Sequence, residues 1–128
     1  MAGSMEKKVL FVDDEPQMLK ILANLARSHG YDPVTADEGM EALLAVEREH
    51  IRVCFLDLRM PKMDGMELCR EIKKLAPNAE IFALCAYVNA FTPEQYAEAG
   101  FTGHFEKPFK IDQILNACRD SFVKLEKG

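Results

Sequence analysis

Long hydrophobic runs are missing from this sequence. The first apolar run, Val9–Val12, covers four residues before Asp13 and Asp14 interrupt it, whereas a membrane span needs about 20 apolar residues. The N-terminus also lacks the apolar core of a signal peptide, because only that short run follows Lys7 and Lys8. The sequence therefore predicts a cytoplasmic protein without a membrane segment.

A surplus of basic charge is missing as well. Lysine and arginine number 16 against 21 aspartate and glutamate residues, which gives a net charge of −5. Proteins that bind the nucleic-acid backbone use a basic surface to release counterions, so nucleic acid is not an expected direct partner. No glycine-rich phosphate loop follows the first apolar run. This argues against a nucleotide-binding enzyme and against a flavoprotein.

Cysteine pairs with metal-binding spacing are missing too. The cysteines form no CxxC motif and no zinc-like spacing with the three histidines; the residues concerned are Cys54, Cys69, Cys85, Cys118, His29, His50 and His104. Each cysteine has apolar neighbours. We expect four reduced thiols that act mainly as small core residues, although Cys85 also lies in a pattern that carries chemistry.

What the sequence does contain is a regular alternation of strands and helices. Its 128 residues suit a single domain. Met1–Ser4 looks like a cloning scar ahead of a native Met5, so one domain is expected over residues 5–128. Strands are predicted at 9–12, 31–36, 53–56, 81–86 and 104–106, each followed by a helical pattern. This order predicts an α/β fold with a parallel sheet covered on both faces.

Helix-capping signals mark where several of these helices begin. Asp37 and Asp64 are expected to cap the second and third helices. Thr92–Gln95 reads as a capping box at the start of the fourth. The apolar face of the second helix is expected to include Met40 together with Leu43, Ala45 and Val46.

Polar groups follow most of the predicted strands. They are Asp13 and Asp14 after the first strand, Asp57 after the third, Cys85 at the end of the fourth and Lys107 after the fifth. Ligands of open parallel sheets bind at the carboxyl ends of the strands. Two carboxylates about 4 Å apart repel by roughly 4 kcal/mol at an effective dielectric constant near 20, so the group needs a cation. Carboxylate oxygens suit Mg²⁺, and Asp57 is the candidate nucleophile for a phosphoryl group.

The sequence resembles the receiver domains of two-component response regulators. The resemblance rests on an ordered set of motifs that spans almost the whole chain: Val12–Glu15, Leu56–Pro61 with Asp64–Gly65, Ala86–Tyr87, Ala99–Gly100 and Lys107–Phe109. It implies a flavodoxin-like (βα)5 fold with strand order 2-1-3-4-5 and helices on both faces of the sheet.

The resemblance also implies roles for individual residues. Asp57 would be the phosphoacceptor and Lys107 would contact the phosphoryl group. Mg²⁺ would be bound by Asp14, Asp57 and the backbone carbonyl of Arg59, with Asp13 acting through a metal-bound water. The bond between Lys107 and its following proline is expected to be cis.

Two positions depart from the family pattern. Cys85 stands where the family usually has Ser or Thr, and a thiol is a weaker hydrogen-bond donor than a hydroxyl. His104 stands at the switch position, which is usually aromatic. Both substitutions bear on how phosphorylation is read out and leave the acceptor chemistry intact.

The resemblance implies a signalling switch. A histidine kinase or phosphotransfer protein would phosphorylate Asp57 in a Mg²⁺-dependent step. The altered surface of the fourth helix, fifth strand and fifth helix would then bind an output protein or domain. Such a domain catalyses its own phosphorylation and dephosphorylation but is chiefly a signalling module. The alternative is an interaction module that acts without phosphorylation. An aspartate phosphatase is disfavoured because Arg59 replaces its second aspartate, and homodimerisation stays open.

Overall fold

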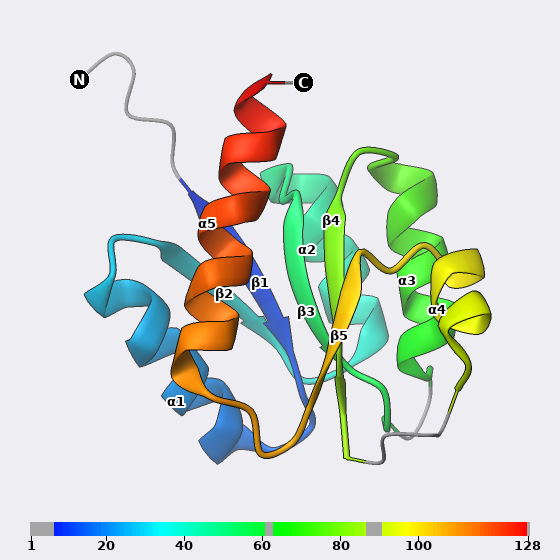
Figure 1. The fold of residues 1–128 in the computed structure, drawn as a ribbon, viewed down its shortest axis with the longest axis horizontal. Coiled ribbons are helices and arrows are strands. Elements are labelled where there is room, and N and C mark those ends of the chain that lie inside the picture. Colours follow the sequence, from blue (N-terminus) through cyan, green and yellow to red (C-terminus); the bar gives the residue numbers. More distant parts are fainter. Residues whose placement is uncertain (1–6, 61–62, 87–90, 128) are drawn as a thin grey trace.

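The computed structural model describes residues 7–60, 63–86 and 91–127. It contains a five-stranded parallel sheet in the order β2-β1-β3-β4-β5 (Figure 1). The strands are β1 (Lys8–Val12), β2 (Asp32–Ala36), β3 (Val53–Asp57), β4 (Glu80–Cys85) and β5 (Gly103–Glu106). This confirms the expected strand order. The proposed scar, Met1–Ser4, lies outside the described residues, as do Pro61 and Tyr87 of the family motifs.

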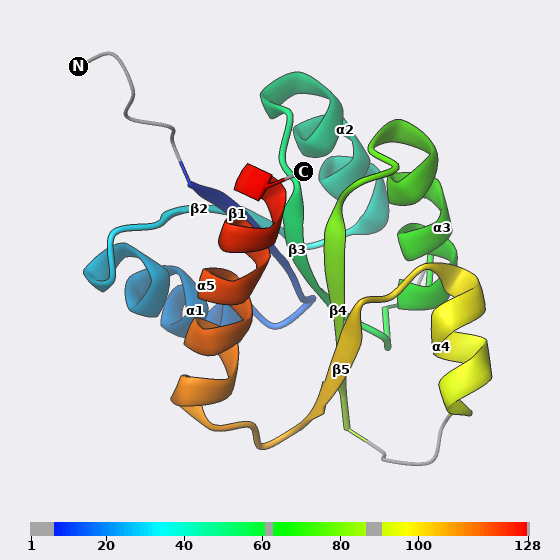
Figure 2. The ribbon, with the colours of Figure 1, turned by 45° about the horizontal axis from the view of Figure 1, so that its top comes forward.

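Five helices cover the two faces of this sheet. They are α1 (Pro16–Ser28), α2 (Gly39–Glu49), α3 (Gly65–Leu75), α4 (Pro93–Ala99) and α5 (Ile111–Lys127). Helices α1 and α5 lie on one face, and α2, α3 and α4 lie on the other (Figures 1 and 2). No helix in the described part of the chain is both long and apolar enough to cross a membrane.

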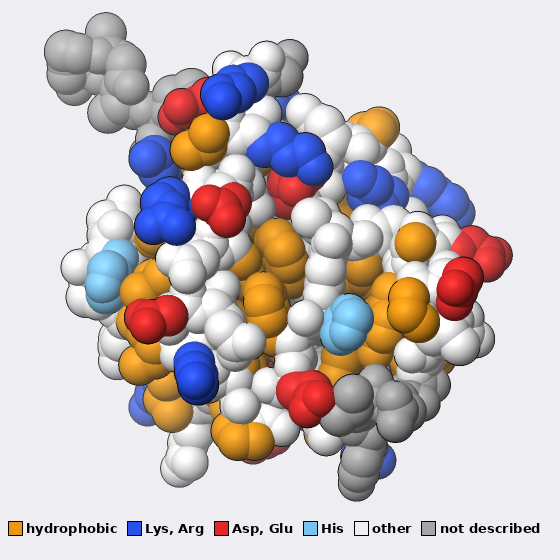
Figure 3. Space-filling model, in the orientation of Figure 1, with side chains coloured by type: hydrophobic (Ala, Val, Ile, Leu, Met, Phe, Trp, Pro, Cys, Tyr) orange, Lys and Arg blue, Asp and Glu red, His pale blue; other side chains and the backbone are white. Residues whose placement is uncertain are grey.

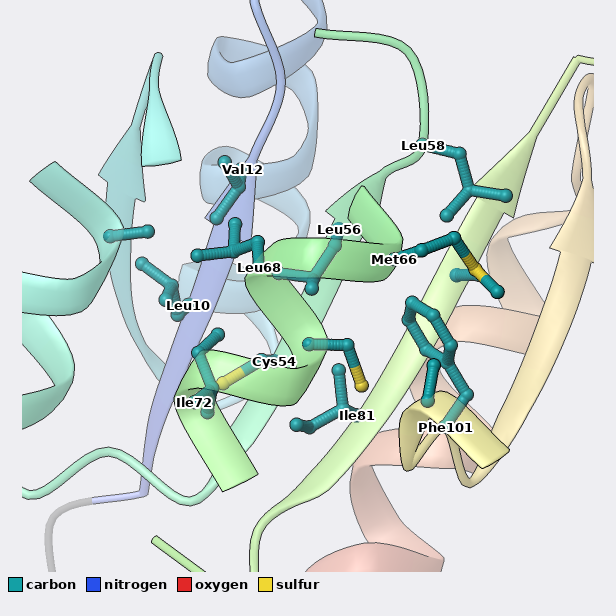
Figure 4. Packing of buried hydrophobic residues seen from close by; sticks show 14 of the residues in the cluster. Leu10, Val12, Cys54, Leu56, Leu58, Met66, Leu68, Ile72, Ile81 and Phe101 are labelled. Carbon is teal, nitrogen blue, oxygen red and sulfur yellow. The ribbon is translucent and has the colours of Figure 1, made fainter. Parts of the chain in front are cut away.

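Strand alternation divides the core into two halves. Leu10, Val12, Cys54 and Leu56 face α2 and α3, where Figure 4 shows them packed with residues such as Ile72. On the other face, four aromatic rings from neighbouring strands stack in a row with centroids 5.1 to 5.7 Å apart: Phe11, Phe55, Phe82 and Phe105. The central strands are therefore buried on both sides, which fixes the positions of the residues at their ends.

The helix starts confirm most of the capping predictions. The Asp64 carboxylate accepts a hydrogen bond from the Glu67 amide at 2.8 Å, and Thr92 and Gln95 form both bonds of a capping box. The position after the Asp64 cap requires glycine, because there is no room for a side chain at Gly65. A Cβ there would come within 2.8 Å of the Leu58 Cα. The start of α3 thus packs directly against the end of β3.

Two predictions for α2 are wrong. The residue at its N-cap is Glu38, with no side-chain cap, because helical geometry begins only at Gly39. Asp37 lies one residue too early to cap, and its amide donates to the Glu41 carboxylate at 3.3 Å. Met40 is exposed instead of facing the core, because Ala42 and Val46 form the buried stripe of the helix.

Candidate functional site

Three carboxylates converge at the carboxyl ends of the two central strands. Asp13 and Asp14 directly follow β1, and Asp57 is the last residue of β3. One oxygen from each carboxylate lies within 4.8 Å of the other two. Asp13 is fully buried, Asp57 is 5% exposed, and Asp14 is open to solvent. The sheet order therefore produces the acidic cluster that the sequence predicted, since β1 and β3 are neighbours.

Lys107 provides the cation that faces this cluster. Its Nζ lies 3.2 Å from Asp13 Oδ2 and 3.6 Å from Asp57 Oδ1. The Lys107 amide donates to the Cys85 carbonyl at 2.7 Å, which ties the end of β5 to the end of β4. The bond between Lys107 and Pro108 is cis, as expected. One ammonium facing three carboxylates leaves an excess of negative charge at this edge.

The electrostatics of the cluster follow from burial and this excess. Burial raises the pKa of the Asp57 carboxyl, and Asp13 and Asp14 add to the effect. The Arg59 amide and the Lys107 ammonium oppose that rise. Burial also disfavours the Lys107 ammonium, yet the charges of Asp57 and Asp13 outweigh it and raise the pKa of Lys107. Lys107 is therefore held in its charged form beside the carboxylates.

Backbone hydrogen bonds fix two of the carboxylates. Asp13 Oδ1 accepts a bond from the Glu15 amide at 2.9 Å, and Asp57 Oδ1 accepts one from the Arg59 amide at 3.2 Å. Each bond turns a carboxylate toward the loop that follows its own strand. The Arg59 side chain is exposed beside the site.

The donor set fits a hard divalent cation. Three carboxylate groups with oxygens this close together, two of them nearly buried, are an unfavourable arrangement without a further positive charge. Mg²⁺ is bound by one or more carboxylates and keeps several waters, which suits a cluster that is open on the Asp14 side. Among the described residues, this group is the one set of acidic, cysteine or histidine side chains with metal-binding proximity.

The two unusual positions, Cys85 and His104, are joined by a residue that the sequence did not single out. Cys85 Sγ lies 3.1 Å from the hydroxyl oxygen of Tyr96 on α4. The ring of Tyr96 stacks on the imidazole of His104 with centroids 4.5 Å apart and an angle of 9°. Burial raises the pKa of the Cys85 thiol, and the Asp57 charge adds to it. The sequence contains one indication that Tyr96 is buried, because it is the only large hydrophobic side chain in α4.

A separate hollow lies between β5 and α5. It has a volume of about 490 Å³, and Phe82, Phe105 and Ala117 line it together with polar and charged side chains such as Asp120 and Lys124. Hydrophobic side chains are visible on both sides of β5, between α5 and α4 (Figure 3). The face formed by α4, β5 and α5 is the one where the resemblance implied that an output partner binds.

Comparison with known proteins agrees with this geometry. Residues 9–119 match the family model of the response regulator receiver domain. Sporulation initiation phosphotransferase F of Bacillus subtilis is 32% identical over 115 residues, which cover 90% of this chain and 93% of that protein. The transcriptional regulatory protein GlrR of Escherichia coli is 35% identical over 113 residues, which cover 88% of this chain. The chain spans only 26% of the length of GlrR.

Solved structures show the same fold. A response regulator receiver domain protein from Clostridium thermocellum superposes with a TM-score of 0.85 at 26% identity, over 93% of this chain and 96% of that one. The receiver domain of sensor histidine kinase PA1611 from Pseudomonas aeruginosa superposes with a TM-score of 0.79 at 26% identity, over 91% and 97% of the two chains. That structure has a magnesium ion coordinated in its active-site cleft.

Proposed function

The chain belongs to the response regulator receiver domain family, and from this membership we propose that it is a signalling switch whose phosphoacceptor is Asp57. The observation that supports this acceptor is its position. The Asp57 carboxylate ends a central strand, lies 3.6 Å from the Lys107 ammonium and adjoins two other carboxylates. Aspartate is an established nucleophile for phosphoryl groups.

The proposed donor is a phosphohistidine on a histidine kinase or a phosphotransfer protein. A carboxylate oxygen of Asp57 attacks the phosphorus, a P–O bond forms, and the P–N bond breaks. The departing imidazole nitrogen keeps the bonding electron pair. Lys107 already lies beside the acceptor oxygen, so its ammonium is placed to bond the phosphoryl oxygens as negative charge arrives. Attack of water on the acyl phosphate later restores the carboxylate and releases phosphate.

The residues proposed to hold Mg²⁺ are Asp13, Asp14, Asp57 and the backbone carbonyl of Arg59. When bound, the cation neutralises charge on the phosphoryl oxygens during transfer. The chain's own contribution is to hold Asp13 and Asp57 in place through the Glu15 and Arg59 amides.

We further propose that the output surface is formed by α4, β5 and α5, with His104 at the switch position. The relatives include a transcriptional regulatory protein and a sporulation phosphotransferase, so the partner is an output protein or an output domain. The hollow between β5 and α5 combines Phe82 and Phe105 with charged side chains such as Asp120 and Lys124, so its partner would offer both apolar and charged side chains. A cytoplasmic location accords with this role.

A second candidate function is favoured by the pairing of Cys85 with Tyr96. A thiol is a weak donor, and here it is already in contact with a hydroxyl. A receiver whose readout group is such a weak donor would bind its partner equally well with and without phosphorylation.

The test is intact mass after incubation with acetyl phosphate, with and without Mg²⁺, on the wild type, Asp57→Asn and Asp120→Asn. Asp120 is an exposed aspartate on α5 and serves as the matched control. A metal-dependent gain of one phosphoryl group that Asp57→Asn abolishes and Asp120→Asn retains supports the proposal. No gain in folded wild-type protein refutes it and favours the phosphorylation-independent module.

A further inference from the structure

The tyrosine between Cys85 and His104 is buried and has aromatic rings around it. Tyr96 is 4% exposed, and with Ala99 it makes up the buried residues of this seven-residue helix. Phe91 and Phe101 contact its ring edge-on, with centroids 5.8 and 5.9 Å away. The position of α4 therefore depends largely on where Tyr96 lies.

The hydroxyl of Tyr96 reaches the end of β4, next to the acceptor strand. Leu84 pairs with Asp57 in the sheet register, so Cys85 lies one residue beyond the acceptor on the neighbouring strand. Cys85 and Asp57 therefore lie at the same end of two hydrogen-bonded strands. Tyr96 is thus one hydrogen bond removed from the phosphorylation site.

A count of protons gives this hydrogen bond a direction. Burial raises the pKa of both the Cys85 thiol and the Tyr96 hydroxyl, so each group carries one proton at neutral pH. If the thiol donated, the buried tyrosine proton would have no other acceptor among the residues that the structure describes, and an unsatisfied hydroxyl is costly. If the hydroxyl donates, the proton that lacks an acceptor in this contact is the thiol proton, and a thiol is the weaker donor.

We propose that Tyr96 is a positioning residue of this receiver: its hydroxyl donates to Cys85 Sγ, leaves the thiol proton available to the acceptor site, and links α4 to the phosphorylation state of Asp57. A phosphoryl group on Asp57 brings acceptor oxygens toward the free S–H. Movement of the sulfur then changes the Tyr96 hydrogen bond and with it the anchor of α4. In this arrangement the signal passes through a side chain of α4 itself. The proposal rests on the proposed function of Asp57.

The test compares Tyr96→Phe with Tyr31→Phe, each alone and the first also combined with Cys85→Ala. Tyr31 stacks on Phe122 on the opposite face of the sheet, so its substitution removes a hydroxyl away from this contact. Two quantities are measured: the rate of Mg²⁺-dependent phosphorylation by acetyl phosphate, and the change in α4 amide chemical shifts on phosphorylation.

Tyr96→Phe should slow phosphorylation by roughly threefold to tenfold, the range expected for one hydrogen bond, and should abolish the α4 response. Tyr31→Phe should change neither. In the Cys85→Ala background, Tyr96→Phe should have no further effect, because the shared hydrogen bond is already gone. If Tyr96→Phe does not fold, Cys85→Ala alone removes the same bond and should also abolish the α4 response.

Two results would overturn the proposal in different ways. Normal phosphorylation with an unchanged α4 response in Tyr96→Phe would refute the role of Tyr96 and leave the proposed function standing. Absence of phosphorylation in folded wild-type protein would refute the proposed function, and the role of Tyr96 with it.

Discussion

Replacing the proposed acceptor should stabilise the protein. We expect Asp57→Asn to raise the free energy of unfolding of the metal-free protein at pH 7. Two charges 4.8 Å apart, the limiting separation in the cluster, repel by about 3.5 kcal/mol at an effective dielectric constant of 20. Asp57 takes part in two such repulsions, with Asp13 and Asp14.

One attraction is lost in the same substitution. The Lys107 ammonium lies 3.6 Å from Asp57, which corresponds to about 4–5 kcal/mol on the same scale. The repulsions exceed this attraction by about 2–3 kcal/mol, and screening around the exposed Asp14 reduces the difference. A net gain of about 1–2 kcal/mol is expected, and the asparagine keeps an oxygen that can accept the Arg59 amide bond.

Urea unfolding followed by circular dichroism, in the presence of a chelator, measures this gain. Asp32→Asn is the control. Asp32 is exposed at the start of the edge strand β2, at the end of the sheet opposite to the acidic cluster. Added Mg²⁺ should then stabilise the wild type more than the variant, since the variant lacks one of the carboxylates proposed to hold the cation. An Asp57→Asn variant that is no more stable than the wild type would refute the electrostatic reasoning.

The pH dependence of the gain has a definite sign. The pKa of Asp57 is higher in the folded protein than its ordinary value of 3.8. Between those two values the folded state binds more protons than the unfolded state, so the contribution of Asp57 to stability falls as pH rises. The advantage of Asp57→Asn should therefore shrink as the pH is lowered toward 3.8. An advantage that grows in acid would contradict the direction of the shift.

Three further predictions concern the rest of the chain. Lys107→Ala should lower the free energy of unfolding by about 3–5 kcal/mol, because it leaves buried Asp13 without its cation; urea unfolding in a chelator measures this, and unchanged stability would contradict it. Thr92→Ala should cost about 1 kcal/mol through loss of the α4 cap, visible as faster amide exchange in that helix. Burial raises the pKa of Cys69 and Cys118 to about 12, so these thiols should react with alkylating reagents only on unfolding, as mass spectrometry would show.

Local signals in the sequence were enough to predict most of the fold. Strand and helix alternation depends on the short-range spacing of apolar residues, and Asp64 and Thr92 cap helices through bonds that reach only three residues ahead. Asp37 was assigned wrongly because a cap depends on which residue first adopts helical geometry. That residue is Gly39, which places Glu38 at the cap.

The contacts of the site were harder to predict when they depended on packing between elements. Asp13 and Asp57 were predicted to meet, because parallel strands end at one edge. Tyr96 was missed because its hydroxyl meets Cys85 only after α4 folds back onto the sheet. The sequence of α4 indicates that Tyr96 is its buried side chain, but it does not indicate the partner, because the contact arises from the packing of a helix against a strand.

The ion pair between Lys107 and Asp13 also has a consequence for folding during synthesis. These residues are 94 positions apart in the chain, whereas β1 and β3, which carry the three carboxylates, lie within its first half. A nascent chain would therefore bring the negative charges together well before the lysine leaves the ribosome. Self-repulsion at that edge would hold the early sheet loose, and tight closure would wait for the last strand. The charge arrangement at this edge would thus also delay completion of the fold.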